Sequence, residues 1–440
     1  MQTLTALDLG KKIETGACDP VDLAQDLLSA IGAHDFGDRI YARVTPDRAL
    51  AEARAAGDRA KRGMRSGPLD GVPLSWKDLF DTAGCATEAG SALLRGRIPT
   101  EDAQVLSNAT LGGSVCLGKT HMSELAFSGL GLNPVTQTPP CVNDHAAVSG
   151  GSSSGAAASV AFGLAPAAIG SDTGGSVRIP AAWNDLVGFK TTAGLVSVRG
   201  VVPLCAKFDT VGPLTKTVAD AAAVFALIQG ARCVDLTPPD PASLHLAILE
   251  TVALDDLRPE PAAAFTDVVA KLERAGVTIT RIQAPEVAQA MDLAGVLYAP
   301  EAYATWRDAI EAQPDVMFDK ILERFRGGAG VSATDYIVGC QHLDQLRDLY
   351  HARVSGFDAV ILPSAPILPP DAQRLMSDDT YYVGENLLAL RNTRIGNLMG
   401  SCAMTLPTGH PSCGLMVQGA PRSDKRLQRL CLAIERALQV

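Results

Sequence analysis

Residues 148–178 constrain the fold of this chain more than any other stretch, and they read VSGGSSSGAAASVAFGLAPAAIGSDTGGSVR. The stretch is rich in glycine, serine and alanine, and its only charged residues are Asp172 and Arg178. Clusters of glycine and serine are typical of flexible linkers. Residues 156–169, between the two clusters, are mostly apolar, and a linker does not bury such a segment. We therefore expect both clusters to be tight turns inside a folded core, where glycine permits unusual backbone angles and close approach.

The composition is that of an ordinary globular protein. Of the 440 residues, 47% are hydrophobic and 20% are charged. The net charge of −10 argues against a nucleic-acid-binding surface. No apolar run reaches the length of about 18 residues typical of a membrane span, and the N-terminal segment lacks the apolar core of a secretory signal. We therefore predict a cytoplasmic protein with no nucleic-acid and no membrane partner.

Cysteine and histidine spacing does not indicate a metal site. The ten cysteines are irregularly spaced and form no C-x-x-C pair, which is typical of free thiols in a reducing compartment. The seven histidines form neither an H-x-x-x-H nor an H-E-x-x-H pattern. We expect no metal and no cofactor, since a chain of this length can bury an ample core without one.

Helical and strand patterns alternate along the chain. Helical patterns cover residues 3–33, 46–62, 103–111, 122–127, 156–163, 217–229, 261–275 and 422–438. Strand patterns cover residues 71–75, 114–117, 164–171, 187–190, 195–198, 244–249, 277–282 and 358–362. This alternation predicts a layered α/β domain with a largely buried sheet. No linker interrupts residues 67–440, and we interpret the helix-rich residues 240–350 as an insertion or lid region.

Three features of the sequence suggest nucleophilic chemistry. Ser152 follows one glycine pair, Ser176 follows another, and Lys77 ends an apolar strand. A serine needs a base to become a nucleophile, and neither serine cluster contains a histidine. A lysine can act as the base if burial lowers its pKa, although a lysine in such a position can also extend its amine to solvent. Residues 174–176 offer consecutive backbone N–H groups that could bind an oxyanion.

Two other motifs compete with this interpretation. Residues 113–120 match the nucleotide-binding P-loop pattern, but their middle residues have strand character and a helix precedes them. Residues 151–155 match the G-x-S-x-G nucleophile elbow, which would make Ser153 the nucleophile. That motif requires a strand directly before it, and the preceding residues do not form one. It would also require partners such as Asp358 and His410, which nothing in the sequence marks.

Four segments carry a resemblance to a known family. They are GVPLSWKD (71–78), GKTHMSELAFSGLGLNP (118–134), SGGSSSGAAASVAFG (149–163) and GSDTGGSVRIPAAWNDLVGFKTT (170–192). Together and in this order they resemble the amidase signature family of serine hydrolases. The similarity extends from about residue 4 to the C-terminal helix and is strongest within 67–215. It implies one large α/β amidase domain over residues 1–440, with a helical N-terminal region (1–65) and a central mixed sheet covered on both faces by helices.

The resemblance also implies an active site. Ser176 corresponds to the nucleophile of the family, Ser152 to a proton-relaying serine that follows a cis peptide bond, and Lys77 to the base. The implied oxyanion hole consists of backbone N–H groups of Thr173, Gly174 and Gly175. Residues at positions that brace the site in the family are Ser153, Asp172 and Arg178. His121 departs from the family, which commonly has asparagine there; it could alter the substrate chamber or be a structural histidine.

The implied function is an amidase that hydrolyses the C–N bond of a small or medium carboxamide to a carboxylic acid and ammonia or an amine, through an acyl-enzyme on Ser176. The alternative is the glutaminase component of a tRNA-dependent amidotransferase, which would need partner subunits. The N-terminal helices could also pair two chains as a homodimer. Specificity is expected from residues 127–147, 290–345 and 370–400. There, Tyr303, Arg307 and Arg394 are candidates to meet a substrate, or else surface and ion-pair residues.

Overall fold

A computed structural model describes residues 4–233 and 235–439 of the chain. Among these residues, eleven strands form one sheet in the order β1-β3-β2-β4-β6-β5-β10-β11-β9-β7-β8. The strands are β1 (Tyr41–Val44), β2 (Pro73–Lys77), β3 (Val115–Thr120), β4 (Ala167–Asp172), β5 (Val187–Lys190), β6 (Thr210–Thr215), β7 (His245–Leu249), β8 (Thr278–Ile282), β9 (Ala359–Pro363), β10 (Cys402–Pro407) and β11 (Gly414–Gly419).

The sheet is mixed. β2 lies between β3 and β4 and is parallel to both, and β7 lies between β8 and β9 in the same way. The other neighbouring strands are antiparallel. Because β2 and β4 are parallel neighbours, their last residues, Lys77 and Asp172, lie on the same side of the sheet, where the C-terminal ends of these strands meet. Residues 240–350, predicted as an insertion or lid region, include β7 and β8 and therefore extend the sheet.

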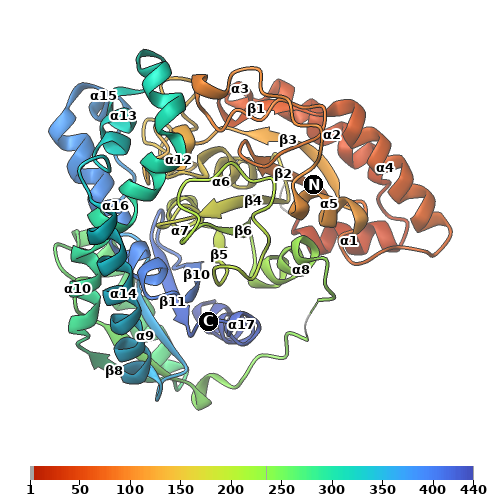
Figure 1. Cartoon of the computed structure of the whole chain (residues 1–440). Coiled ribbons are helices and arrows are strands. Elements are labelled where there is room, and N and C mark those ends of the chain that lie inside the picture. The colour runs from red at the N-terminus through yellow and green to blue at the C-terminus, as the bar shows by residue number, and fades with distance from the viewer. Residues whose placement is uncertain (1–3, 234, 440) are drawn as a thin grey trace.

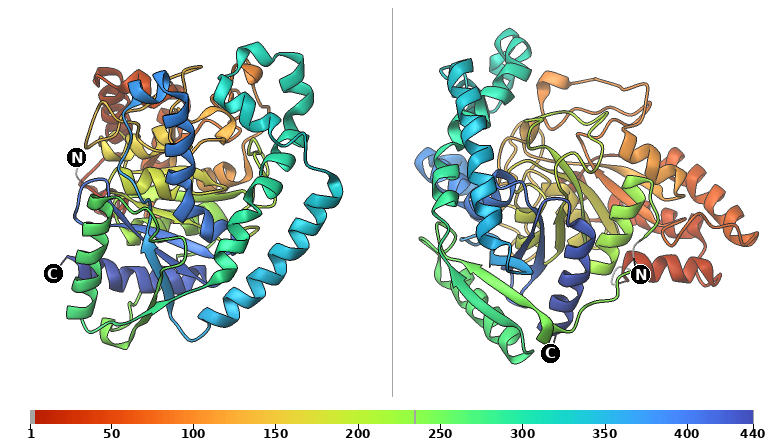
Figure 2. Two further views of the ribbon diagram at one scale, coloured as in Figure 1. Left: turned by 90° about the vertical axis from the view of Figure 1, so that its left-hand side faces the viewer. Right: turned by 60° about the horizontal axis from the view of Figure 1, so that its bottom comes forward.

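Helices surround the sheet (Figure 1). They are α1 (Ala6–Glu14), α2 (Pro20–Ala33), α3 (Gly37–Ile40), α4 (Pro46–Lys61), α5 (Gln104–Leu111), α6 (Ser154–Ala161), α7 (Arg178–Trp183), α8 (Val218–Gln229), α9 (Pro259–Arg274), α10 (Pro285–Asp292), α11 (Ala294–Leu297), α12 (Ala299–Ala312), α13 (Asp319–Arg326), α14 (Ala333–Val354), α15 (Ala372–Ser377), α16 (Asp379–Leu398) and α17 (Asp424–Leu438). The long helix α14 runs along the outside of the molecule (Figure 2). Within the described residues, no helix is long and apolar enough to cross a membrane.

Side chains of β4 pack against helices on both faces of the sheet, because successive residues of a strand point to opposite sides. Ala168 belongs to a cluster with Ala156, Ala157 and Val160 of α6 and Ala181 of α7. Its neighbours Ala167 and Ile169 belong to the main core, together with residues of α8 and α17. The predicted α/β fold, a mixed sheet covered on both faces by helices, is therefore confirmed, and β4 and the turn that follows it are held from both sides.

Some local predictions were wrong. Residues 195–198 were expected to form a strand, but they lie in a turn region outside the ladders. Val196 is buried in the core there, so its apolar character reflects packing, with no strand pairing. Residues 122–127 contain only the short 3-10 helix η2 (Glu124–Ala126), in which Leu125 and Ala126 have positive φ angles. The first predicted helix begins at Ala6, and residue 3 lies outside the described residues.

Candidate active site

The Lys77 side chain is fully buried at the end of β2, so it does not extend to solvent. Its Nζ lies 2.7 Å from the Ser152 Oγ and 2.8 Å from the Ser171 Oγ. Burial lowers the pKa of Lys77 to about 7, although the carboxylates of Asp172 and Asp209 act in the opposite direction. A substantial fraction of this lysine is therefore neutral near pH 7, and a neutral amine can accept a proton.

The turn that carries Ser152 packs against the turn that carries Ser176. The Gly151–Ser152 peptide bond is cis, and the Ser152 side chain is fully buried. The Ser153 N–H donates to the Ser176 carbonyl oxygen at 3.2 Å, and the Ser153 hydroxyl donates to the Ser171 carbonyl oxygen at 3.2 Å. Gly151 is needed here, because a Cβ at this position would lie 2.5 Å from the Gly131 nitrogen.

Ser176 lines a cavity of about 390 Å³ between the turn after β4 and helices α11, α13 and α16. Thr173 and Gly174 line the same cavity, whereas Lys77 and Ser152 are not among its lining residues. The structure thus places Ser176 at the cavity wall and the other two predicted residues in the interior behind it. A molecule in this cavity would meet Ser176 first.

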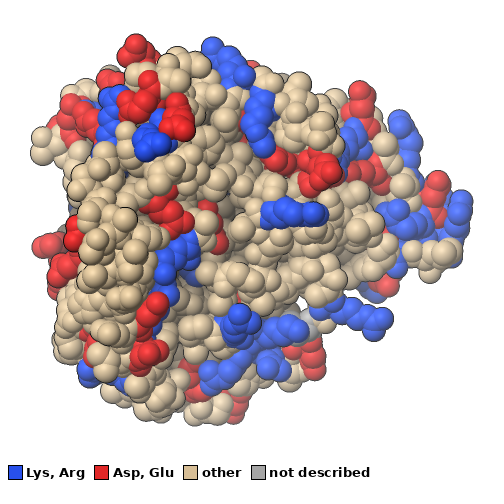
Figure 3. All heavy atoms as spheres, in the orientation of Figure 1, with Lys and Arg blue, Asp and Glu red and all other residues tan. Residues whose placement is uncertain are grey.

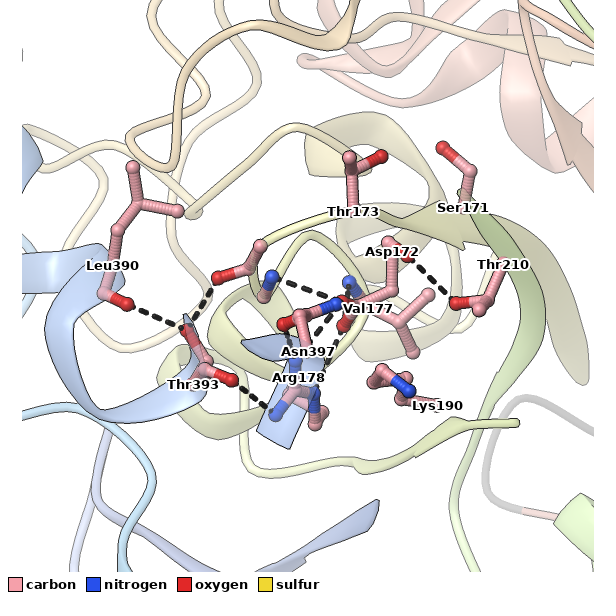
Figure 4. A network of polar contacts seen from close by, with 12 residues as sticks. Ser171, Asp172, Thr173, Val177, Arg178, Lys190, Thr210, Leu390, Thr393 and Asn397 are labelled. Atoms are coloured by element: carbon pink, nitrogen blue, oxygen red, sulfur yellow. Dashed lines mark hydrogen bonds and ion pairs between the residues drawn. The ribbon is translucent and has the colours of Figure 1, made fainter. Parts of the chain in front are cut away.

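Asp172 fixes the turn after β4 through its two carboxylate oxygens (Figure 4). Its Oδ1 accepts hydrogen bonds from the Gly175 N–H, the Arg178 Nη2 and the Asn397 Nδ2, each at 2.9 Å. Its Oδ2 accepts from the Val177 N–H at 3.2 Å and the Arg178 Nε at 3.0 Å. Burial alone would raise the pKa of Asp172, but the Arg178 guanidinium and these donors hold it at about 2.

This network uses one of the three predicted oxyanion-hole donors. The Gly175 N–H points to the Asp172 carboxylate and would have to break that bond to reach a substrate. Gly175 instead provides room, since a Cβ there would lie 2.0 Å from the Thr393 Oγ1, and its φ is +136°. The N–H groups of Thr173 and Gly174 remain candidates at the cavity wall.

Three residues near the predicted site were missed by the sequence analysis. Ser171 receives a hydrogen bond from Lys77, although it directly precedes Asp172 in the segment that was singled out. Thr393 donates to the Gly174 carbonyl oxygen at 2.9 Å, and Asn397 bonds both Asp172 and Arg178. Thr393 and Asn397 stand four residues apart on α16, so they share a helix face. That spacing alone did not distinguish them from other polar helix residues.

The other candidate residues lie apart from this cavity or have a structural role. Tyr303 is half-buried against the core and donates to Glu311, the exposed Arg307 pairs with its neighbour Asp308, and neither lines the cavity. His121 is buried, and burial lowers its pKa to about 4, which keeps the ring neutral near pH 7. Arg394, by contrast, lines the cavity.

Neither competing motif has the geometry it requires. Residues 115–120 of the P-loop match form strand β3, and Lys119 is buried between Thr87 and Asp78. For the elbow motif, Asp358 pairs with Arg426, and His410 pairs with Asp267. Neither of these pairs includes Ser153, whose hydroxyl bonds the backbone of β4. All ten cysteines are free thiols, and no cluster that could hold a metal ion occurs within the described residues.

Comparisons with known proteins agree with the fold. The family model "Amidase" matches residues 22–427. The chain is 34% identical to a 2-amino-5-chloromuconic acid deaminase from Comamonas testosteroni, over 93% of this chain and 92% of that protein. It is 30% identical to a glutamyl-tRNA(Gln) amidotransferase A-subunit from Chloroflexus aggregans, over 96% and 94%. The crystal structure of a peptide amidase from Stenotrophomonas maltophilia superposes with a TM-score of 0.85 at 26% identity, covering 100% of this chain and 97% of that one.

The resemblance of the four sequence segments is therefore confirmed by a match over nearly the whole chain. The relatives are named as a deaminase and an amidotransferase subunit, and the superposed enzyme is named as a peptide amidase. This chain belongs to the amidase family and is a hydrolase of carbon–nitrogen bonds other than peptide bonds.

Proposed function

We propose that this amidase cleaves the C–N bond of a small or medium carboxamide through an acyl-enzyme on Ser176, with Ser152 as the proton relay and Lys77 as the base. The contact between Lys77 and Ser152 carries this proposal. A buried lysine whose pKa is lowered to about 7 lies 2.7 Å from a buried serine, and the serine turn is bonded to the Ser176 backbone. The hydrogen-bond partners of Lys77 are hydroxyl groups, and within the described residues no carboxylate forms an ion pair with it.

The acylation step moves one proton along this path. The Ser176 Oγ attacks the carboxamide carbon and passes its proton to the Ser152 Oγ, while the Ser152 proton passes to the Lys77 Nζ. Neutral Lys77 has two N–H bonds and a lone pair, so it can accept from Ser152 while donating to Ser171. The proton then returns through Ser152 to the leaving nitrogen as the C–N bond breaks. Water attacks the resulting ester by the same path and releases the carboxylic acid.

The surrounding residues bind the oxyanion or hold the two turns in place. We assign the developing oxyanion to the backbone N–H groups of Thr173 and Gly174, and Gly175 to holding the turn, because its N–H already bonds Asp172. Ser153, Asp172 and Arg178 brace the two turns through the contacts described above. No step requires a metal or cofactor.

Ser176→Ala is the direct test of this proposal. We expect ammonia release from a panel of aliphatic and aryl carboxamides to fall by at least about a thousandfold, because the nucleophile is lost. Ser154→Ala is the matched control, since Ser154 lies in the same serine cluster and its hydroxyl donates to the His121 carbonyl oxygen; it should keep at least half the activity. Unchanged ammonia release by Ser176→Ala would contradict the assignment.

The relatedness to an amidotransferase component supports one alternative, a glutaminase that works within a larger assembly. The two functions differ in what the isolated chain does. We expect the purified chain to hydrolyse simple carboxamides without a partner. Activity confined to glutamine, and only in the presence of the other amidotransferase components, would favour the alternative. A cytoplasmic location and a homodimer formed through α1 and α2 remain predictions.

A further inference from the structure

Two guanidinium groups line the cavity beside Ser176. Arg324 comes from α13 and Arg394 from α16. Within the described residues, neither guanidinium has a hydrogen bond or an ion pair. Their contacts are with aromatic rings: Arg324 lies 4.5 Å from the centroid of the Phe127 ring, and Arg394 lies 5.8 Å from that of Tyr298. Two cations therefore face one cavity, and neither is paired with an anion among the described residues.

The other buried or half-buried arginines among the described residues have hydrogen-bond partners, whereas exposed ones such as Arg54 and Arg62 are solvated. The buried Arg178 contacts Asp172, Asn397 and the backbone of α16. On the surface, Arg326 pairs with Glu311, and basic and acidic side chains are interspersed on the face shown in Figure 3. Arg324 and Arg394 thus differ from the other half-buried arginines, and both line the cavity.

The environment makes these charges costly. The Arg324 Nη1 is buried, and no described residue accepts a hydrogen bond from it. Burial, followed by the positive charge of Arg394, lowers the pKa of Arg324 to about 10. Burial also lowers the pKa of Arg394. Both groups stay charged at neutral pH, and an uncompensated charge of this kind is unfavourable unless a ligand supplies the missing anion.

The remaining cavity residues do not supply that anion. Lys320 lines the cavity and pairs with Asp379 at 2.6 Å. Glu323 is the one acidic residue among the described lining residues, and its exposed side chain forms no ion pair with Arg324 or Arg394. Much of the wall is apolar, as at Phe127 and Leu390. The cavity therefore combines an apolar wall with excess positive charge.

Arg394 also has a fixed relation to the reaction centre. It directly follows Thr393, whose hydroxyl bonds the Gly174 carbonyl oxygen at 2.9 Å. Gly174 and Ser176 line the same cavity as Arg394. A ligand held by the guanidinium would therefore lie beside the turn that carries the nucleophile.

We propose that the substrate carries a carboxylate, bound by Arg394 and Arg324, at the end opposite the carboxamide that Ser176 attacks. The substrate class is then the monoamide of a dicarboxylic acid. Guanidinium groups bind carboxylates through paired N–H···O bonds, and the apolar wall suits a short carbon chain between the two ends. This inference rests on the proposed function of Ser176.

The test compares the monoamides of succinic, glutaric and adipic acid with uncharged primary amides of the same chain length. We expect at least one monoamide to exceed its uncharged counterpart about a hundredfold in kcat/KM. Arg394→Met and Arg324→Met should each lower that ratio at least about thirtyfold, mainly through KM. Arg307→Met, at an exposed arginine of α12, is the matched control and should leave the ratio unchanged. A preference for uncharged amides, or equal losses on both substrates, would overturn the proposal.

A binding measurement separates this proposal from the assignment of Ser176. Titration calorimetry of Ser176→Ala with succinate, glutarate and adipate should detect binding that is lost when Arg394→Met is added. Such binding without amide hydrolysis by the wild-type enzyme would support the carboxylate site and contradict the proposed reaction. Amide hydrolysis without carboxylate preference or binding would support the proposed reaction and contradict the carboxylate site. If neither hydrolysis nor binding occurs, both proposals are contradicted. Circular dichroism checks that each variant is folded.

Discussion

At the scale of single residues, three basic side chains lie where burial makes their positive charge unfavourable. Lys77 loses its hydration on burial, and its neutral hydroxyl partners do not compensate for the lost hydration of a positive charge. Arg324 and Arg394 are cations without an anion among the described residues. Groups that are costly to the fold and lie in, or directly behind, the wall of one cavity indicate function.

The pH dependence of catalysis should follow Lys77. Its pKa is lowered to about 7, and the proposed base must be neutral, so kcat/KM should fall about tenfold per pH unit below pH 7 and level off above about pH 8. Initial rates from about pH 5 to 9 measure this. Lys77→Met should lose at least about a thousandfold in rate. Residual activity with the same acid limb would show that another group titrates.

The same residue should make stability depend on pH. The folded pKa of Lys77, about 7, lies below the ordinary value of 10.5, so between these values the unfolded chain binds a proton that the folded chain does not. Stability attributable to Lys77 therefore falls as pH drops from 10.5 to 7 and is constant below. Lys77→Met should raise the free energy of unfolding by about 2–5 kcal/mol at pH 7, and the gain should shrink towards about pH 10.

Urea unfolding of the wild type and the variant at several pH values checks this difference. The exposed Lys61, at the end of α4, provides the control. Lys61→Met should change stability by less than about 0.5 kcal/mol at every pH. A Lys77→Met protein that is less stable than the wild type at pH 7 would mean that the lysine has a structural role.

At the scale of elements, the site is assembled where parts distant in sequence meet. β2 and β4 bring Lys77 to the end of β4 because they are parallel neighbours. The turn after β4 is closed from the other side by α16, whose Thr393 and Asn397 hold the Gly174 carbonyl and the Asp172 carboxylate. α16 also contributes Arg394 to the cavity. One helix thus both holds the turn of the proposed nucleophile and lines the cavity.

Thr393→Val tests the positioning role of α16. Valine has a similar shape but cannot donate to the Gly174 carbonyl oxygen, so the turn carrying Ser176 should lose its fixed position. We expect kcat to fall about tenfold with little change in KM, since the residue touches no substrate. Thr405→Val is the matched control, because the Thr405 hydroxyl contacts Ser364, outside the cavity. A change confined to KM, or equal losses in both variants, would contradict this role.

At the scale of the whole molecule, the sequence predicted the structure of residues 148–178 better than that of their surroundings. The glycine–serine turns within 148–178 were expected in the core, because the apolar segment between them can be recognised in the sequence. Ser152 is indeed buried there. Thr393 and Asn397 were not predicted, since a polar residue on a helix face has the same local pattern whether it meets water or Asp172. The role of Lys77 could be weighed only once its burial and its partners were known.

Arg178 connects three distant parts of the chain, and the fold should depend on it. Its guanidinium bonds Asp172 on β4, Asn397 and the Thr393 carbonyl oxygen on α16, and it contacts Met416 on β11. Lysine keeps the charge but cannot form all of these hydrogen bonds, and buried polar atoms left without partners are costly. Arg178→Lys should therefore destabilise the fold by about 3–5 kcal/mol at pH 7, as measured by urea unfolding.

The pH dependence identifies the source of this loss. Because Asp172 has a pKa of about 2, below its ordinary value of 3.8, its interaction with Arg178 contributes stability above about pH 4 and loses it as pH falls towards about 2. The difference between the wild type and Arg178→Lys should therefore shrink below about pH 4. Arg326→Lys, at the exposed pair with Glu311, should cost less than about 1 kcal/mol. Equal losses at both arginines would mean that the buried network does not hold the sheet and α16 together.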